Sequence, residues 1–298
     1  MRLTSLAARA LTSLVVMALA AMLTFLLIDL APGSYVDDLA ANPQVSRETV
    51  ARLRDQFGLD RPFYEKFARW AGSLAHGDIG YSLVYQRPVR QLIAERLWNT
   101  VALNLAALAL AWTIGLPLGL AAAANRGSPI DWTIGALAAV LLSTPAVVLA
   151  LVVLACAARQ AWPLGSMAWP TAAIAAVWLP AVARHTRSAV GSALDASHTL
   201  AARARGVGRL RLVAVHALRE ALGPLSSFVG ISVAAVVSAS LPVEVVTGWP
   251  GIGQLAFDAV LRRDLFLVVD LVQVAALLLL AGNLAGDLLL RAVDPRVA

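Results

Sequence analysis

Long apolar runs, separated by short polar segments, follow one another along almost the whole chain. A helix that crosses a membrane needs about 20 mostly apolar residues, and six runs come close to that length. The pattern predicts an all-α integral membrane protein with six transmembrane helices, over Ala10–Leu30, Trp98–Ala122, Trp132–Ala158, Met167–Ala183, Ser227–Val246 and Leu265–Leu290. The fourth run is the shortest and contains Pro170 and Pro180. Proline is tolerated in such helices where neighbouring helices satisfy the freed backbone groups.

The first apolar run follows Arg2 and Arg9, as the core of a secretory signal peptide would. A signal core has roughly 7–15 apolar residues, and the run over Ala10–Leu30 is longer than that. We therefore expect it to be an uncleaved first transmembrane helix.

The polar segment between the first two runs has the pattern of short amphipathic helices. Ser46 is placed to cap a helix over Arg47–Phe57, which Gly58 would end. Pro62 would open a second helix that stops near Gly77 and carries aromatic residues at helical spacing, namely Phe63, Phe67 and Trp70. Because these helices offer no large core of their own, we expect a helical cap packed on the outer ends of the spans.

Composition supports a membrane environment. Hydrophobic residues make up 59% of the 298 residues, charged residues make up 14%, and the mean hydropathy is +0.75. A soluble domain has roughly 25% charged residues, so this chain lacks the polar surface that water requires. The net charge of +6 could suit nucleic acid. However, the arginines lie in loops between apolar runs, where topology and anionic lipid headgroups explain them better. We expect the lipid bilayer as a partner and no nucleic acid.

The distribution of arginine predicts the orientation. Six spans place both termini on one side, and cytoplasmic loops carry the excess of basic residues. If the termini are cytoplasmic, the inner segments hold twelve arginines: Arg2, Arg9, Arg126, Arg184, Arg187, Arg203, Arg205, Arg209, Arg211, Arg219, Arg291 and Arg296. The short outer loops hold three: Arg159, Arg262 and Arg263. The segment 31–97 is too long to count. The sequence therefore predicts that both termini are cytoplasmic.

The inner segment from Arg184 to Arg219 is polar and rich in arginine, and it lies between two apolar runs. Asp195 or Ser197 could cap a short helix that runs to Arg205, and Gly206 could supply the left-handed turn that ends it. Small side chains at Ala201, Ala202 and Ala204 would let another backbone come close. A second helix from Gly208 would carry an apolar stripe of Leu210, Val213, Ala214, Ala217 and Ala221. Such a segment suits a groove on a soluble partner. The alternative is that its arginines only bind lipid headgroups and fix the topology.

No catalytic or metal-binding motif appears in the sequence. It has no Gly-rich phosphate loop, CxxC pair or GxSxG elbow, and its four histidines fall in no metal-ligand spacing. We therefore expect no catalytic residue, no metal and no cofactor in this chain, and no enzymatic activity.

Polar residues within spans are costly and often line a pathway or a bundle core. Candidates for an outer gate or pathway are Glu244, Trp249, Pro250, Gly251, Asn104 and Asp270. Glu244, near the outer end of the fifth run, is the strongest of these. The Trp249-Pro250-Gly251 motif predicts a tight turn between the fifth and sixth runs, which either only connects them or lines the outer gate. For any single polar residue, helix–helix hydrogen bonding is the competing interpretation.

The inner segment resembles the cytoplasmic loop of ABC-importer permeases. Their pattern is Glu-Ala-Ala, three residues, Gly; here Leu200 replaces the glutamate, whereas Ala201, Ala202 and Gly206 match. The dipeptide, oligopeptide and nickel branch favours Ala-Arg-Ala-(Lys/Arg)-Gly, which matches residues 202–206. It also favours His-Ala-Leu-Arg-Asn-Ala-Leu, which this chain has as His216-Ala217-Leu218-Arg219-Glu220-Ala221-Leu222.

The resemblance to this branch covers the whole length. It is carried by Phe57-Gly58-Leu59-Asp60-Arg61-Pro62, Gly77-Asp78-Ile79-Gly80-Tyr81-Ser82, Ser143-Thr144-Pro145, Gly248-Trp249-Pro250-Gly251-Ile252-Gly253 and Asp294-Pro295-Arg296. The chain departs from the pattern at Ala31-Pro32-Gly33-Ser34, where Pro-Gly-Asp-Pro is usual.

The resemblance implies a permease subunit of a type I ABC importer in the bacterial inner membrane. Residues 1–30 would hold the first span, 31–97 the extracytoplasmic helical segment and 98–298 the permease domain with its coupling loop over 184–222. The segment Ala201–Gly208 would be the coupling helix. The implied partners are a second homologous permease, two cytoplasmic ATPase subunits that bind ATP and Mg, and an extracytoplasmic solute-binding protein. The solute would be a peptide or a related molecule such as a nickel chelate.

Two other classes of function compete with this one. An ATP-independent secondary transporter would show two related halves with paired interrupted helices, and no such internal repeat is visible in the sequence. A membrane scaffold or pore would use the arginines for lipids alone.

Overall fold

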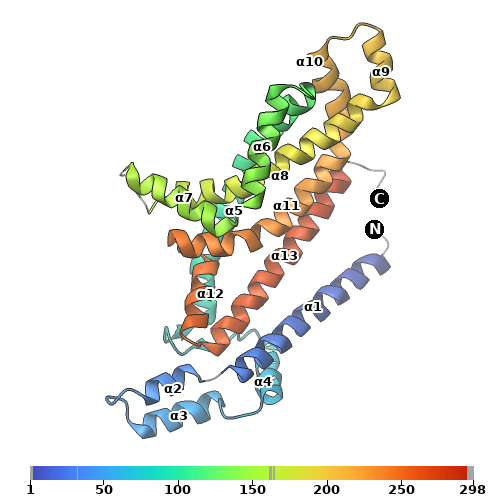
Figure 1. Ribbon diagram of the computed structural model, residues 1–298. Coiled ribbons are helices and arrows are strands. Elements are labelled where there is room, and N and C mark those ends of the chain that lie inside the picture. Colours follow the sequence, from blue (N-terminus) through green and yellow to red (C-terminus); the bar gives the residue numbers. More distant parts are fainter. Residues whose placement is uncertain (1–2, 32, 161–162, 164, 294–298) are drawn as a thin grey trace. The chain divides into compact units, whose positions relative to one another are not determined.

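The computed structural model describes residues 3–31, 33–160, 163 and 165–293, and Figure 1 shows that helices make up nearly all of it. The first elements are α1 (Leu3–Leu30), α2 (Tyr35–Ala40), α3 (Arg47–Phe57) and α4 (Phe63–Ala75), followed by an antiparallel pair of strands, β1 (Tyr81–Ser82) and β2 (Arg87–Pro88). Next come α5 (Val89–Ala124), α6 (Pro129–Ser143), α7 (Ala146–Arg159), α8 (Ala168–Asp195), α9 (Ser197–Ala204) and α10 (Arg209–Arg211). A π-helical turn (Leu212–Ala217) leads into α11 (Leu218–Thr247), α12 (Ile252–Leu261) and α13 (Leu265–Val293). Arg2, Pro32 and the Asp294-Pro295-Arg296 motif lie outside the described residues.

The all-α membrane class is confirmed, but the count of six spans is not. By length and apolar composition, three helices of the described residues qualify as membrane spans, or up to five if each of two bent pairs is one span. The predicted third span is one of these pairs, because α6 and α7 meet at an angle of 106°. The fourth predicted run is a helix, α8, but it is not among the qualifying spans. It carries prolines and ends in polar residues.

The bend between α6 and α7 has a local cause. Proline disfavours helical geometry in the residue before it, and Thr144, which precedes Pro145, is extended with ψ of 124°. Pro145 then stands at the N-terminus of α7, where its missing N–H costs nothing. The apolar run continues across this point, so hydropathy alone predicts one helix where the backbone makes two.

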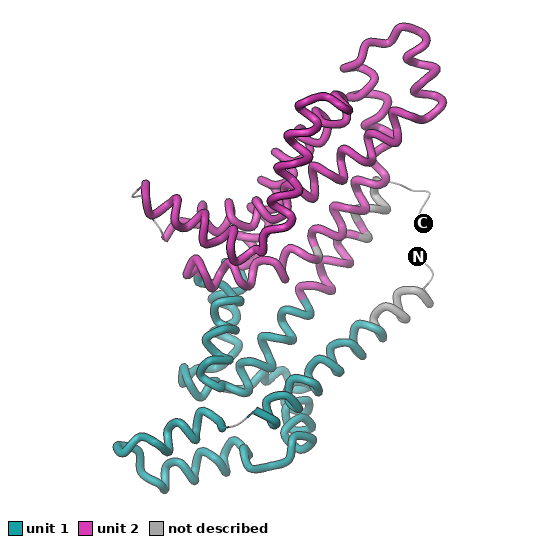
Figure 2. Tube along the Cα trace, in the orientation of Figure 1, with its two compact units in different colours: residues 1–99, 250–277 teal, residues 100–249, 278–298 magenta. Residues whose placement is uncertain are grey.

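The chain forms two compact units, coloured separately in Figure 2. Unit 1 contains residues 1–99 and 250–277, and unit 2 contains residues 100–249 and 278–298. Each unit therefore joins segments that are far apart in the sequence. This grouping differs from the predicted segments 1–30, 31–97 and 98–298, which stay a prediction.

Unit 1 has two apolar clusters. In one, the start of α5 packs with α12 and the beginning of α13, through residues such as Ile93, Leu255 and Leu267. In the other, Trp70 of α4 and Phe25 of α1 pack with Val269 of α13. The predicted packing of the cap on the ends of the spans is confirmed within this unit.

The predicted helix boundaries of the cap are confirmed. The Ser46 hydroxyl accepts a hydrogen bond from the Thr49 N–H, and Gly58 ends α3 in the left-handed conformation with φ of 60°. Helix α4 begins after Pro62 and stops just before Gly77. Local rules of capping and turn formation were sufficient to place these ends.

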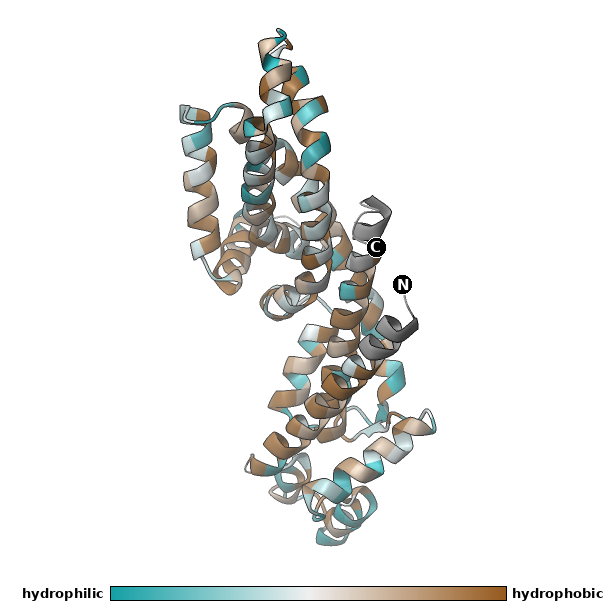
Figure 3. Cartoon of the chain, turned by 90° about the vertical axis from the view of Figure 1, so that its right-hand side faces the viewer, coloured by the Kyte–Doolittle hydropathy of each residue, from teal (hydrophilic) through white to brown (hydrophobic). Residues whose placement is uncertain are grey.

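Unit 2 is organised around α8, which contacts α6, α7 and α11. One apolar cluster joins α5, α7, α8 and α11 around Leu103, Ile174 and Val243. A second joins α5, α8 and the start of α11 around Val190 and Leu225. Figure 3 shows that apolar residues cover most helices and that hydrophilic residues interrupt them on α9–α10 and on α2–α4.

Candidate functional site

The candidate site is the segment between α8 and α11, which we call the arginine loop and define as residues 196–217. Gly206 has φ of +82°, so the predicted left-handed turn after α9 is confirmed. The Gly206 N–H donates to the Arg203 carbonyl at 3.0 Å, and the Val207 N–H donates to the Ala202 carbonyl at 3.3 Å. These two bonds satisfy carbonyls at the end of α9 and fix the turn toward α10.

The predicted side-chain cap of α9 is wrong. Ala196 precedes the helix in extended geometry, and no side chain caps it. Asp195 is the last residue of α8, and its carboxylate accepts a hydrogen bond from Arg126 Nη1 at 2.8 Å. The carboxylate is therefore engaged by another loop and does not serve the α9 amides.

Buried residues anchor the arginine loop to unit 2. Thr199 and Ala202 of α9 are buried, as are Leu212, Val213 and Ala217 of the π-helical turn. Val213 and Ala217 belong to the cluster that also contains Val190 of α8. In addition, His198 Nε2 lies 2.7 Å from Glu220 Oε2 of α11. Since both ends pack on long helices, the loop is held to α8 and α11.

The opposite face of the arginine loop is exposed. Leu200 is 50% exposed and Leu210 84%, and this face also includes Ala201, Arg203, Ala204, Arg205, Gly206, Gly208, Arg209 and Arg211. Among the described residues, no acidic side chain pairs with the four arginines of this face; Arg205 Nε donates only to its own helix, at the Ala201 carbonyl. The loop therefore presents a cationic surface on which small side chains and the exposed Leu200 and Leu210 lie between the charges.

Two details of the predicted loop surface need correction. Ala202 packs against this chain and is 2% exposed, so only two of the three predicted alanines, Ala201 and Ala204, are exposed. The predicted stripe is divided: Val213, Ala217 and Ala221 are buried, whereas Leu210 is 84% exposed and Ala214 is exposed. The π-helical turn changes the residue spacing per turn, so a register drawn at 3.6 residues does not hold there. His216 lies half-buried in this turn, and Arg219 is exposed at the start of α11.

Three of the pathway candidates lie in unit 2. Asn104 of α5 is buried, and its Nδ2 donates to Ser240 Oγ of α11 at 3.1 Å. Glu244 is fully buried one turn after Ser240, and Trp249 packs on the same apolar cluster. Asn104 Oδ1 is buried without a protein partner among the described residues. Asn104 therefore contacts Ser240 inside an apolar bundle, and Glu244 is buried one helical turn further along α11.

The other three pathway candidates lie in unit 1. The Pro250 carbonyl accepts a hydrogen bond from Asn99 Nδ2 at 2.8 Å. Gly251 precedes α12, a helix that the sequence analysis missed between the fifth and sixth runs. Asp270 of α13 is buried and accepts a hydrogen bond from Trp70 Nε1 at 2.8 Å. The chain turns at this motif as predicted, after Gly248 with φ of 67°, but the turn leads into α12 rather than directly into the sixth run.

The sequence analysis also missed a charged pair between α6 and α8. Asp131 of α6 is buried and accepts hydrogen bonds from Arg187 of α8, including one from Nη2 at 2.8 Å, and from the Gly127 N–H at 3.0 Å. The sequence analysis counts Arg187 only among the arginines that predict the membrane orientation. The available clue was Ser128, whose side chain accepts from the Asp131 N–H and caps α6. That places Asp131 at a helix N-terminus but does not identify its partner.

Comparison with known proteins agrees with the geometry. Residues 115–298 match the family described as the binding-protein-dependent transport system inner membrane component. A Brucella suis protein named as a peptide transport system permease is 34% identical, over 95% of both chains. The dipeptide transport system permease protein DppB of Escherichia coli K12 is 30% identical, and the oligopeptide transport system permease protein AppB of Bacillus subtilis is 29% identical; each match covers 93% of both chains.

A solved structure supports the fold. An inward-facing structure of the MetNI methionine ABC transporter contains a chain that matches with a TM-score of 0.62 and 22% identity, over 70% of this chain and 98% of that one. Together with the family match over more than half of the residues, the comparisons show that this multi-pass membrane protein belongs to the binding-protein-dependent transport system inner membrane components, the permease subunits of ABC importers.

Proposed function

We propose that this permease carries peptides and that its arginine loop docks on a cytoplasmic ATPase. The solute class comes from the relatives, which are named for dipeptides, oligopeptides or peptides and are similar over nearly their full length. Nickel chelates and an ATP-independent mechanism are not favoured by these names.

The observation that carries the docking proposal is the two-sided construction of the arginine loop. One side is buried in unit 2 through Ala202, Val213 and Ala217. A displacement of the loop would therefore be transmitted directly to α8 and α11. The other side exposes Arg203, Arg205, Arg209 and Arg211 without acidic partners among the described residues. A lever needs both a rigid attachment and a free face, because a loose loop would absorb the motion.

The remaining parts of the transporter follow from this assignment. A second homologous permease would complete the pathway, two ATPase subunits would bind ATP and Mg, and an extracytoplasmic binding protein would deliver the peptide. Both termini would be cytoplasmic, on the same side as the arginine loop. This chain would perform no chemistry and would convert ATPase closure into exposure of the peptide site to one side or the other.

Charge reversal on the free face tests the docking proposal. In membranes that contain the complete transporter, Arg203→Glu should release the ATPase subunits during purification and abolish dipeptide uptake, while the permease stays inserted. The control is Arg52→Glu, an exposed arginine of α3, which should change neither. If Arg203→Glu purifies with the ATPase and transports normally, the exposed arginines only fix topology or bind headgroups.

Uptake measurements separate the transport classes. We expect uptake of labelled dialanine that requires ATP and persists after an uncoupler collapses the ion gradient. Uptake that depends on the gradient alone would support a secondary transporter. Uptake of a nickel chelate but of no peptide would contradict the proposed solute class.

A further inference from the structure

Unit 1 contains a cavity of about 670 Å³ between the end of α1, the cap helices and the start of α13. Its apolar wall includes Leu27 and Ile28 of α1 and Leu265, Val268 and Val272 of α13. All lining residues belong to unit 1. The volume falls within the roughly 300–1,000 Å³ of small-molecule sites. We call it the cap cavity.

The rim of the cap cavity is charged but balanced. Three acidic and three basic residues line it: Asp29, Asp37, Asp60, Arg54, Lys66 and Arg263. Lys66 Nζ lies 2.6 Å from Asp29 Oδ1, and Arg54 pairs with Asp37. Arg263 Nη1 lies 3.3 Å from Asp38 Oδ1 and is 46% exposed. Asp60 has no ion-pair partner among the described residues.

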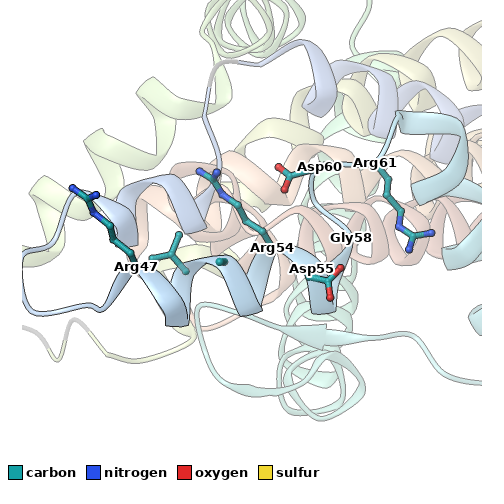
Figure 4. A pocket seen from close by; sticks show the side chains of 8 residues that line it. Arg47, Arg54, Asp55, Gly58, Asp60 and Arg61 are labelled. Atoms are coloured by element: carbon teal, nitrogen blue, oxygen red, sulfur yellow. The ribbon is translucent and has the colours of Figure 1, made fainter.

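Asp60 also borders a second, shallower pocket of about 350 Å³ along α3. Figure 4 shows Arg54 and Asp60 together on one side of the turn after α3, with Asp55 on the other side. Arg54 and Asp60 line both spaces. The charged rim therefore continues from the cap cavity onto the surface of α3.

The wall formed by α1 faces an apolar surrounding. α1 is a candidate membrane span of which only a small part is buried in the protein. Leu23 is 55% exposed, Leu27 57% and Leu30 73%. These exposed side chains need an apolar surrounding, which lipid acyl chains would supply, and Leu27 is both exposed and part of the lining of the cap cavity. An acyl chain can therefore lie on α1 and continue into the cavity.

We propose that the cap cavity binds one phospholipid with a zwitterionic headgroup that carries a primary ammonium. An acyl chain lies against the α1 and α13 walls, the phosphate lies near Arg263 and Lys66, and the ammonium lies near Asp60. An anionic headgroup fits less well, because Asp60, the rim charge that has no ion-pair partner among the described residues, is negative. The site is separate from the arginine loop and does not depend on the transported solute.

Native mass spectrometry of the complete detergent-purified transporter tests this proposal, with added phosphatidylethanolamine or phosphatidylglycerol. We expect one phosphatidylethanolamine to be retained. Leu27→Trp fills the cavity and should reduce its retention at least about fivefold. The matched control is Leu19→Trp on the same helix: Leu19 is 60% exposed, and it does not line the cavity. Asp60→Asn should lower the preference for phosphatidylethanolamine over phosphatidylglycerol by about threefold.

Several results would overturn the proposal. Equal retention by Leu27→Trp and Leu19→Trp would place the lipid elsewhere on the surface, and preferred retention of phosphatidylglycerol would refute the zwitterionic headgroup. Displacement of the lipid by dialanine would make the cavity a peptide site. If Leu27→Trp fails to fold, the exposed Asp60→Asn change still tests the headgroup assignment. Dipeptide uptake and ATPase binding are measured separately, so a failure here leaves the docking proposal unaffected.

Discussion

At the scale of single residues, buried carboxylates are the most constrained groups in this protein. A carboxylate taken out of water needs hydrogen-bond donors or a counter-charge to offset its lost hydration. Asp131 obtains both from Arg187 and the Gly127 N–H. Asp270 obtains one donor from Trp70. Because these partners come from different helices, each carboxylate also specifies how two elements pack.

The Asp131 pair should contribute measurably to stability. Asp131→Asn keeps the shape but removes the charge that Arg187 contacts, so we expect the thermal unfolding midpoint to fall by about 3 °C. Asp195→Asn provides the control, since the Arg126–Asp195 pair is exposed on both sides and exposed pairs contribute little. Its midpoint should change by less than about 1 °C. A larger loss for Asp195→Asn than for Asp131→Asn would show that burial does not determine the contribution.

Sequence alone predicted residues whose roles are local and missed those whose roles depend on distant partners. Ser46 and Gly58 were placed correctly because capping depends on neighbours within a few residues. The Trp70–Asp270 hydrogen bond joins residues 200 positions apart. No local pattern identifies such a partner, so the role of Trp70 became visible only with the packing of α4 on α13.

At the scale of elements, two glycines set how helices approach and how they end. Gly119 of α5 faces α8 closely: an added Cβ would lie 2.5 Å from the Ala183 carbonyl and 2.5 Å from Thr186 Cβ. Gly206 is different, since nothing lies within 4 Å of its added Cβ but its φ is +82°. Gly119 is required because a side chain does not fit between the helices, and Gly206 is required because its backbone is left-handed.

Gly119→Ala should destabilise the contact between α5 and α8. The methyl group would force the helices apart, so we expect the unfolding midpoint to fall by about 5 °C. Gly135→Ala in α6 is the matched change, because nothing lies within 4 Å of its added Cβ, and no loss is expected there. Equal midpoints for the two variants would mean that the helices do not pack as closely as described.

Gly206→Ala should make the arginine loop less stable without a steric clash, because nothing lies within 4 Å of the added Cβ. A left-handed conformation costs a residue with a side chain about 1 kcal/mol, so amide hydrogen exchange in α9 should become about fivefold faster. Gly208→Ala is the comparison, since Gly208 has φ of −61° and open space around it, and exchange should stay unchanged. Identical exchange in both variants would remove the argument that Gly206 fixes the turn.

The predicted elements failed where the backbone departs from a regular helix. The bend of 106° at Pro145 divides a continuous apolar run, and the π-helical turn shifts the buried face after Gly208. A hydropathy profile averages over many residues and therefore reveals neither the bend nor the π-helical turn. The bend comes from the extended Thr144 before Pro145, and the π-helical turn adds a residue to the spacing.

At the scale of the whole molecule, the chain belongs to the permease subunits of ABC importers. Its long apolar helices suit a membrane protein. In the proposed function, energy reaches this permease through a surface that docks on the ATPase. In the described part of the chain, the arginine loop combines exposed cations with firm attachment to α8 and α11.

The most direct measurement is cross-linking from the arginine loop in membranes that contain the complete transporter. A photoreactive residue at Arg203 should capture the ATPase subunit, and the yield should change when ATP is added. The same probe at Arg52 should capture no ATPase. Capture of only lipid or an extracytoplasmic protein from Arg203 would contradict the central claim that this loop couples the permease to ATP hydrolysis.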